Sequence, residues 1–181
     1  MKNLEALTKE QANEESREIF NQIEKKLGKV PNIYATIGNS SKALAATLNI
    51  GETIKQGEFS GKEIEAIALA VAQANSCDYC LAAHTVVGKM QGFSLDDTVA
   101  IRSGVIKDAK LKALTDLAKA ITETRGYPEP ALVESFYDNG YNQAALAELI
   151  VLIAANIITN YTNHLAGTEI DFELAPQLAE A

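Results

Sequence analysis

The chain has 181 residues and only two cysteines, Cys77 and Cys80, and one of its two histidines, His84, follows four residues after the second. If this segment is helical, the three side chains share one face, because residues three and four apart are neighbours on a helix. Two thiols at this spacing can close a small-loop disulfide, and an imidazole one turn away can accept a proton from Cys80. Since the thiolate is the reactive form of cysteine, the segment indicates redox chemistry.

Two other interpretations of the cysteine pair stay open. Free cysteine is among the most buried residue types, so the two thiols could be small core side chains. They could also bind a metal, although a structural zinc site takes four ligands and only His164 and carboxylates remain to complete one. We favour redox function and expect no metal, haem or flavin cofactor.

Glu65 is a candidate for moving protons. No charged residue follows it before Asp78, so it opens an almost wholly apolar segment. A carboxylate at the edge of a core has a raised pKa, which suits proton transfer near neutral pH. The alternative is an ordinary acidic residue that the helix dipole favours near a helix N-terminus.

Three further residues are possible walls of the site. Tyr79 points away from the face that carries the thiols, so packing is its simpler role. His164 follows the longest expected helix, where a polar C-terminal cap explains it. Asn160 shares a polar stripe with Asn156 and Asn163 at helical spacing beside apolar residues. Because buried amides need hydrogen-bond partners, this stripe suggests an interface or a site wall.

The segments that must position these residues all read as helices, and none alternates as a strand does, so we predict an all-α fold. The segment before Cys77 is Ala-rich and follows a capping box at Ser60 and Glu63, which argues against the strand that precedes a thioredoxin-like motif. We expect a loosely ordered tail after Gly167. The expected helices span about residues 9–27, 41–56, 61–75, 77–90, 109–124, 131–138 and 142–162, with short ones opened by Pro31 and Ser94.

Composition narrows the class of protein. The net charge of -8 disfavours nucleic acid as a partner, because phosphate binding needs a basic face. We do not expect the polar, acidic N-terminus to be a signal peptide, and we expect the apolar run over residues 146–159 to be too short and too polar to span a membrane. We therefore expect one cytoplasmic domain, where a C-x-x-C pair is more often redox-active or metal-binding than structural.

The chain resembles the alkylhydroperoxidase AhpD-like family of the carboxymuconolactone decarboxylase superfamily. Redox members of that family carry a Glu, a C-x-x-C pair twelve residues later and a His four residues after the second Cys. The matching residues are Glu65 and Cys77-x-Tyr79-Cys80-x-x-Ala83-His84. The segment Asn160-Tyr161-x-Asn163-His164-Leu165-Ala166 is similar to the peroxidase-related branch. The resemblance covers roughly residues 30–170, with an N-terminal helical segment at 1–29 and a tail at 171–181.

The resemblance implies an all-helical homo-trimer or homo-hexamer that reduces hydroperoxides with an external dithiol or adaptor protein. It makes Cys80 the peroxidatic cysteine, Cys77 the resolving one, and Glu65 with His84 the proton relay. The characterised peroxidases have a His where this chain has Tyr79, so one relay member is missing. Members that decarboxylate lactones typically lack the cysteine pair, which disfavours that activity.

Helix-dipole reasoning alone favours Cys77 as the lower-pKa thiol, whereas the spacing to His84 and the resemblance favour Cys80, to which we assign the attack. Two other functions stay open: a disulfide reductase or thiol-redox sensor with little peroxide turnover, and a non-enzymatic oligomeric stress or metal-binding protein. Apolar residues almost all round the expected helix at 142–162 also predict a homo-oligomer.

Overall fold

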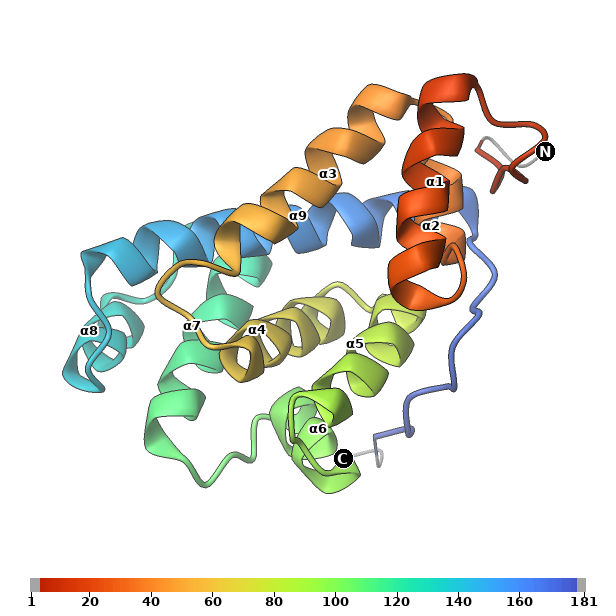
Figure 1. The fold of residues 1–181 in the computed structure, drawn as a ribbon. Coiled ribbons are helices and arrows are strands. Elements are labelled where there is room, and N and C mark those ends of the chain that lie inside the picture. The colour runs from red at the N-terminus through yellow and green to blue at the C-terminus, as the bar shows by residue number, and fades with distance from the viewer. Residues whose placement is uncertain (1–3, 179–181) are drawn as a thin grey trace.

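The computed structural model describes residues 4–178, and in this part of the chain every regular element is an α-helix. The all-α prediction is confirmed, and each expected helix is present (Figure 1). The N-terminal helix begins later than expected, because Asn13 caps it by accepting a hydrogen bond from the Ser16 N–H, and the last helix continues beyond residue 162 to Ala166. The helices are α1 (Glu14–Leu27), α2 (Asn32–Ile37), α3 (Ser41–Ile54), α4 (Gly61–Ala74), α5 (Asp78–Met90), α6 (Leu95–Ser103), α7 (Ala109–Thr124), α8 (Pro130–Asp138) and α9 (Gln143–Ala166).

Helix α4 lies at the centre of the fold. It packs against α5, α6, α7 and α9, and every residue from Ala66 to Ala72 is buried. Burial on all sides explains why this helix is apolar all round rather than along one stripe. Helix α1 packs into the same apolar cluster as the cysteines, through Phe20 and Ile23, so the described residues form one domain.

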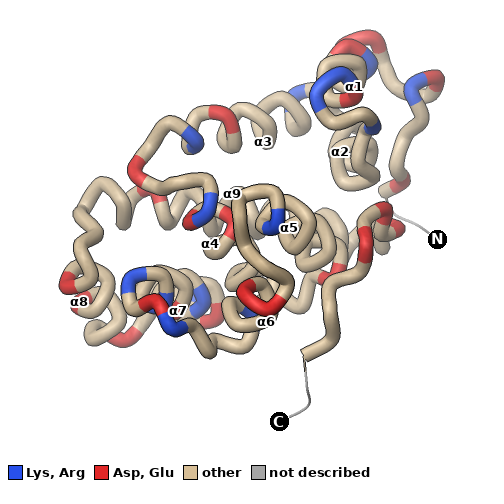
Figure 2. Tube along the Cα trace, turned by 60° about the horizontal axis from the view of Figure 1, so that its bottom comes forward, with Lys and Arg blue, Asp and Glu red and all other residues tan. Residues whose placement is uncertain are grey.

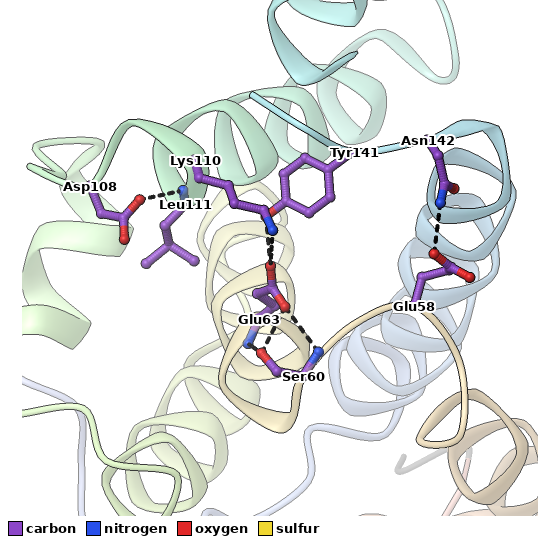
Figure 3. Close-up of polar contacts among 8 residues, drawn as sticks. All are labelled: Glu58, Ser60, Glu63, Asp108, Lys110, Leu111, Tyr141 and Asn142. Atoms are coloured by element: carbon purple, nitrogen blue, oxygen red, sulfur yellow. Dashed lines mark hydrogen bonds and ion pairs between the residues drawn. The ribbon is translucent and has the colours of Figure 1, made fainter. Parts of the chain in front are cut away.

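A capping box fixes the start of α4. The Ser60 hydroxyl accepts a hydrogen bond from the Glu63 N–H at 3.2 Å, and the Glu63 carboxylate accepts one from the Ser60 N–H at 2.9 Å. The same carboxylate accepts the Tyr141 hydroxyl at 2.8 Å and lies 3.8 Å from the Lys110 ammonium (Figure 3). The start of α4 is thereby tied to α7 and to the residues that enter α9, which places Glu65, two residues further on.

Helix α9 is the longest element, with 24 residues, and contacts α2, α3, α4, α5 and α7. By length and composition alone it is apolar enough to cross a membrane, which we did not expect from the run over residues 146–159. Its contacts with five other helices account for part of this character, because packing on several sides needs apolar residues on several faces (Figure 1). However, 33% of its apolar window is buried, so further apolar side chains of α9 are exposed. Lys and Arg residues are scattered among acidic ones along the tube of Figure 2 and form no basic stripe in that view.

The C-terminal strap, residues 168–178, is docked along the molecule, so the expectation of a loosely ordered tail is wrong for these residues. The Asp171 carboxylate accepts the Tyr79 hydroxyl at 2.7 Å and lies 2.8 Å from the Lys29 ammonium. The Phe172 ring meets the Tyr79 ring edge-on, with centroids 5.6 Å apart. A hydrophobicity pattern cannot reveal an irregular segment held in this way, because its partners are distant in sequence.

Replacing Tyr79 with phenylalanine should loosen the strap. The change removes a hydroxyl that donates to Asp171 and accepts the Ile33 N–H at 3.2 Å, and losing a buried partner costs about 1–3 kcal/mol. We expect faster hydrogen exchange over residues 168–178 and a lower melting temperature. Tyr127, which is exposed, provides the matched Tyr→Phe control. Equal exchange rates in the two variants would show that this hydroxyl does not hold the strap.

Candidate active site

The two thiols meet at the N-terminus of α5. Helix α5 begins at Asp78, and Cys77 precedes it as the N-cap, so its sulfur accepts the Cys80 N–H at 3.4 Å. The thiols are free, and the Cys77 S–H donates to the Cys80 sulfur at 2.6 Å. Cys77 is 1% exposed and Cys80 3%, so the pair is screened from bulk water.

Two carboxamides of α9 reach these sulfurs. The Asn160 side chain donates an N–H to the Cys80 sulfur at 2.9 Å, and Asn163 donates one at 3.3 Å. The Asn163 nitrogen is 3.8 Å from the Cys77 sulfur. The Asn160 carbonyl oxygen accepts an N–H from Asn75 at 2.8 Å, which orients its amide toward the thiols. Cys80 therefore has more donors at its sulfur than Cys77.

The two thiols differ in acidity for this reason. The hydrogen bond that the Cys77 S–H donates to the Cys80 sulfur lowers the pKa of the Cys80 thiol. Burial raises this pKa, whereas the hydrogen bonds from the N–H groups of Asn163 and Asn160 lower it further. The pKa of Cys77 is raised, first because its proton is shared with the Cys80 sulfur and then because it is buried. The helix dipole taken alone favours a thiolate at Cys77. The hydrogen bond between the two sulfurs and the hydrogen bonds from the α9 amides instead favour the thiolate at Cys80.

Glu65 and His84 form the second part of the site. The Glu65 carboxylate lies 2.8 Å from His84 Nδ1, and both side chains are largely buried between α4 and α5. Burial lowers the pKa of His84, but attraction to Glu65 and the hydrogen bond between them outweigh it, so the pKa is raised. A carboxylate that holds Nδ1–H leaves Nε2 free to exchange protons. Because His84 follows Cys80 by one turn of α5, the imidazole is on the thiol face of that helix.

Part of this geometry lies within a region that matches a known family: residues 41–123 match the model of the carboxymuconolactone decarboxylase family. This region of the chain is therefore similar to the carboxymuconolactone decarboxylase family. The matched region contains Glu65, both cysteines and His84, whereas the asparagines of α9 lie beyond it. No match was found among curated proteins.

Solved structures share the fold over nearly the whole chain. A cysteine-to-alanine variant of the debrominase Bmp8 in complex with 2,3,4-tribromopyrrole is 18% identical, with a TM-score of 0.79 over 93% of this chain and 91% of that one. An uncharacterized peroxidase-related protein from Silicibacter sp. TM1040 is 23% identical, with a TM-score of 0.76 over 93% and 92%. An uncharacterized peroxidase-related protein from Ralstonia eutropha JMP134, described as an alkylhydroperoxidase AhpD core, is 17% identical, with a TM-score of 0.80 over 92% and 90%. At these identities the likeness shows the fold.

Two of the possible wall residues form no hydrogen bond with the thiols in the described part of the chain. The Tyr79 hydroxyl points to Asp171 and the Ile33 backbone, because its position on α5 faces the strap. His164 is exposed on the last turn of α9 and stacks near Tyr161, with ring centroids 6.4 Å apart. Asn160, by contrast, contacts Cys80 directly.

Sequence reasoning missed two neighbours of the site. Asn75 orients Asn160, and the only sequence signal for it was a polar residue at the end of an apolar helix. Tyr34 of α2 has a raised pKa, first through burial and then through the negative charge of Glu65. The sequence carries no signal for Tyr34, because α2 is distant from α4 along the chain.

Proposed function

We propose that this AhpD-like protein is a cytoplasmic, thiol-dependent hydroperoxide reductase. The observation that carries the proposal is the Cys80 sulfur, which accepts hydrogen bonds from Cys77, Asn160 and Asn163. Cys80 also lies one turn of α5 before His84, which pairs with Glu65 of α4. Donors at a sulfur stabilise its thiolate, and a carboxylate-bound imidazole can carry the proton away.

In the proposed reaction, His84 with Glu65 takes the proton from Cys80. The thiolate attacks the terminal oxygen of the hydroperoxide, the O–O bond breaks, and the departing alkoxide takes a proton from the imidazolium to leave as an alcohol. Cys80 is then a sulfenic acid. Cys77 attacks the Cys80 sulfur, forms the disulfide and releases water, and an external dithiol reduces the disulfide by exchange.

The test is consumption of an organic hydroperoxide by the reduced protein with a dithiol in excess. We expect many molecules of peroxide to be consumed per protein molecule and one dithiol to be oxidised per peroxide. Oxidation of the cysteines by peroxide without turnover, combined with rapid reduction of added disulfides, would instead favour the disulfide reductase or thiol-redox sensor. Bromide release from 2,3,4-tribromopyrrole, the compound bound to Bmp8, is a useful third assay and would redirect the proposal to dehalogenation.

The metal-binding alternative has no further support. Structural zinc needs four ligands, and among residues 4–178 no group of three or more His, Cys, Asp or Glu side chains is arranged to hold a metal ion.

We also propose that the protein is a homo-oligomer, a trimer or hexamer as the family resemblance implies. One face of α9 exposes a stripe of large apolar side chains at helical spacing: Ile150, Ile158, Tyr161 and Leu165, each at least 40% exposed. A continuous apolar stripe of this length is typical of a surface that another chain covers.

Replacing Ile158 with glutamate should weaken the oligomer, because a charge in a covered apolar face must be desolvated. Sedimentation equilibrium near micromolar concentration should give a multiple of the 19.4 kDa chain for the wild type and a smaller species for the variant. Val105 is 74% exposed and lies outside the stripe, so Val105→Glu is the matched control. A monomeric wild type would refute the assembly.

A further inference from the structure

The disulfide of the proposed cycle offers an external thiolate two sulfurs to attack, and the surroundings of those sulfurs are not equivalent. In thiol–disulfide exchange the rate depends on which sulfur is attacked and on the acidity of the thiol that leaves, since a more stable thiolate leaves faster. The direction of attack therefore depends on which sulfur the protein stabilises better as an anion.

The α9 carboxamides favour Cys80 in this respect. Asn160 Nδ2 is 2.9 Å from the Cys80 sulfur, and Asn163 Nδ2 is 3.3 Å from Cys80 but 3.8 Å from Cys77. Hydrogen bonds to a charged partner are roughly twice as strong as neutral ones, so these contacts act mainly on the thiolate. A neutral thiol is a weak acceptor and gains less from them.

The position of these amides is fixed by the fold. Asn160 is 0% exposed and its carbonyl oxygen is held by Asn75. Asn163 is 5% exposed, and its carbonyl oxygen is buried without a hydrogen-bond partner among residues 4–178, so the hydrogen bonds that its side chain makes there are those of its N–H group with the sulfurs. Because water is largely excluded, no solvent donor can easily replace the amides at Cys80. The sulfurs already lie 2.6 Å apart, so closing the disulfide moves neither sulfur far from them.

We propose that Asn160 and Asn163 make Cys80 the leaving group, so that the external dithiol attacks Cys77. This inference rests on the proposed function for its reductant. One thiolate of the dithiol attacks the Cys77 sulfur, a mixed disulfide forms, the Cys77–Cys80 bond breaks, and its electron pair stays on Cys80 as a thiolate that accepts the two N–H groups. The second thiol of the dithiol then loses its proton and attacks the reductant's first sulfur, which breaks the bond between that sulfur and Cys77. Cys77 takes up that proton, and the reductant leaves as a disulfide.

The position of the mixed disulfide tests this directly. Oxidised protein is mixed briefly with glutathione, quenched with acid, and the freed thiol is alkylated. Tandem mass spectrometry of the peptide with both cysteines then locates the adduct. We expect the adduct on Cys77 in the wild type. In Asn160→Ala or Asn163→Ala the ratio of adduct on Cys77 to adduct on Cys80 should fall roughly tenfold, since a hydrogen bond to a charged group contributes about a factor of ten or more.

The matched control is Asn156→Ala. Asn156 is buried on the same helix, but its side chain donates to the Leu152 carbonyl of α9 and contacts neither thiol. In the Asn156→Ala variant the preference of the glutathione adduct for Cys77 should equal that in the wild type. An adduct mainly on Cys80 in the wild type, or a full preference retained in both Asn160 and Asn163 variants, would overturn the proposal.

A second measurement covers the case in which the Asn160 variant, which also loses its contact with Asn75, does not fold. Alkylation of Cys80 by iodoacetamide, followed across pH in reduced protein, should be roughly tenfold slower near neutral pH in Asn163→Ala and unchanged in Asn156→Ala. An unchanged profile in Asn163→Ala would count against the proposal. Neither measurement uses a hydroperoxide, so attack at Cys77 without peroxide turnover would refute the proposed function alone.

Discussion

Replacing Cys80 with serine is expected to abolish hydroperoxide reduction, whereas replacing Cys77 should leave one oxidation event per protein without turnover. A serine hydroxyl at position 80 cannot form the thiolate that attacks the peroxide. Without Cys77, the Cys80 sulfenic acid forms but has no neighbouring thiol to condense with. The measurement combines peroxide consumption with a probe selective for sulfenic acid, located by mass spectrometry.

The two variants share their environment, so each is a control for the other. Both side chains are buried in the same apolar cluster, and serine is close to cysteine in size. Thermal melts of the two variants should therefore be similar. A sulfenic acid on Cys77 in the Cys80→Ser protein, with none on Cys80 in the Cys77→Ser protein, would reverse the assignment of roles.

Replacing Glu65 with glutamine should slow peroxide reduction by about 100-fold while the fold is retained, because positioned acid–base groups contribute about 10²–10⁴ in rate. The carboxylate also raises the pKa of His84, so its removal should lower that pKa and the imidazolium should lose its proton at a lower pH. The titration can be followed by NMR of the two histidines, with exposed His164 as the internal reference.

The exposed Glu134 provides the matched Glu→Gln control, which should alter neither turnover nor the His84 titration. The pH profile of Cys80 alkylation in Glu65→Gln completes the test, since loss of the relay should change it. If turnover, the thiol profile and the His84 titration all match the wild type, Glu65 is only an acidic residue near a helix start.

Local sequence was enough to predict the all-α fold and most of its helix boundaries, although α1 begins later and α9 ends later than expected. Capping boxes, helix-breaking residues and helical periodicity depend on contacts within about four residues, so they can be read without the fold. The Ser60–Glu63 box is present as expected. Local spacing also placed His84 on the same helix face as Cys80, and it singled out Glu65 as the acid leading an uncharged helix.

The tertiary structure alone decided which residues surround the sulfurs. Asn160 meets Cys80 from 80 positions along the chain, and this contact exists because α9 packs against both α4 and α5. The polar stripe of α9 indicated burial without identifying a partner, since helical periodicity specifies a face and not what that face touches. For the same reason the sequence could not identify the partner of Tyr79, which is Asp171 of the irregular strap, 92 positions away.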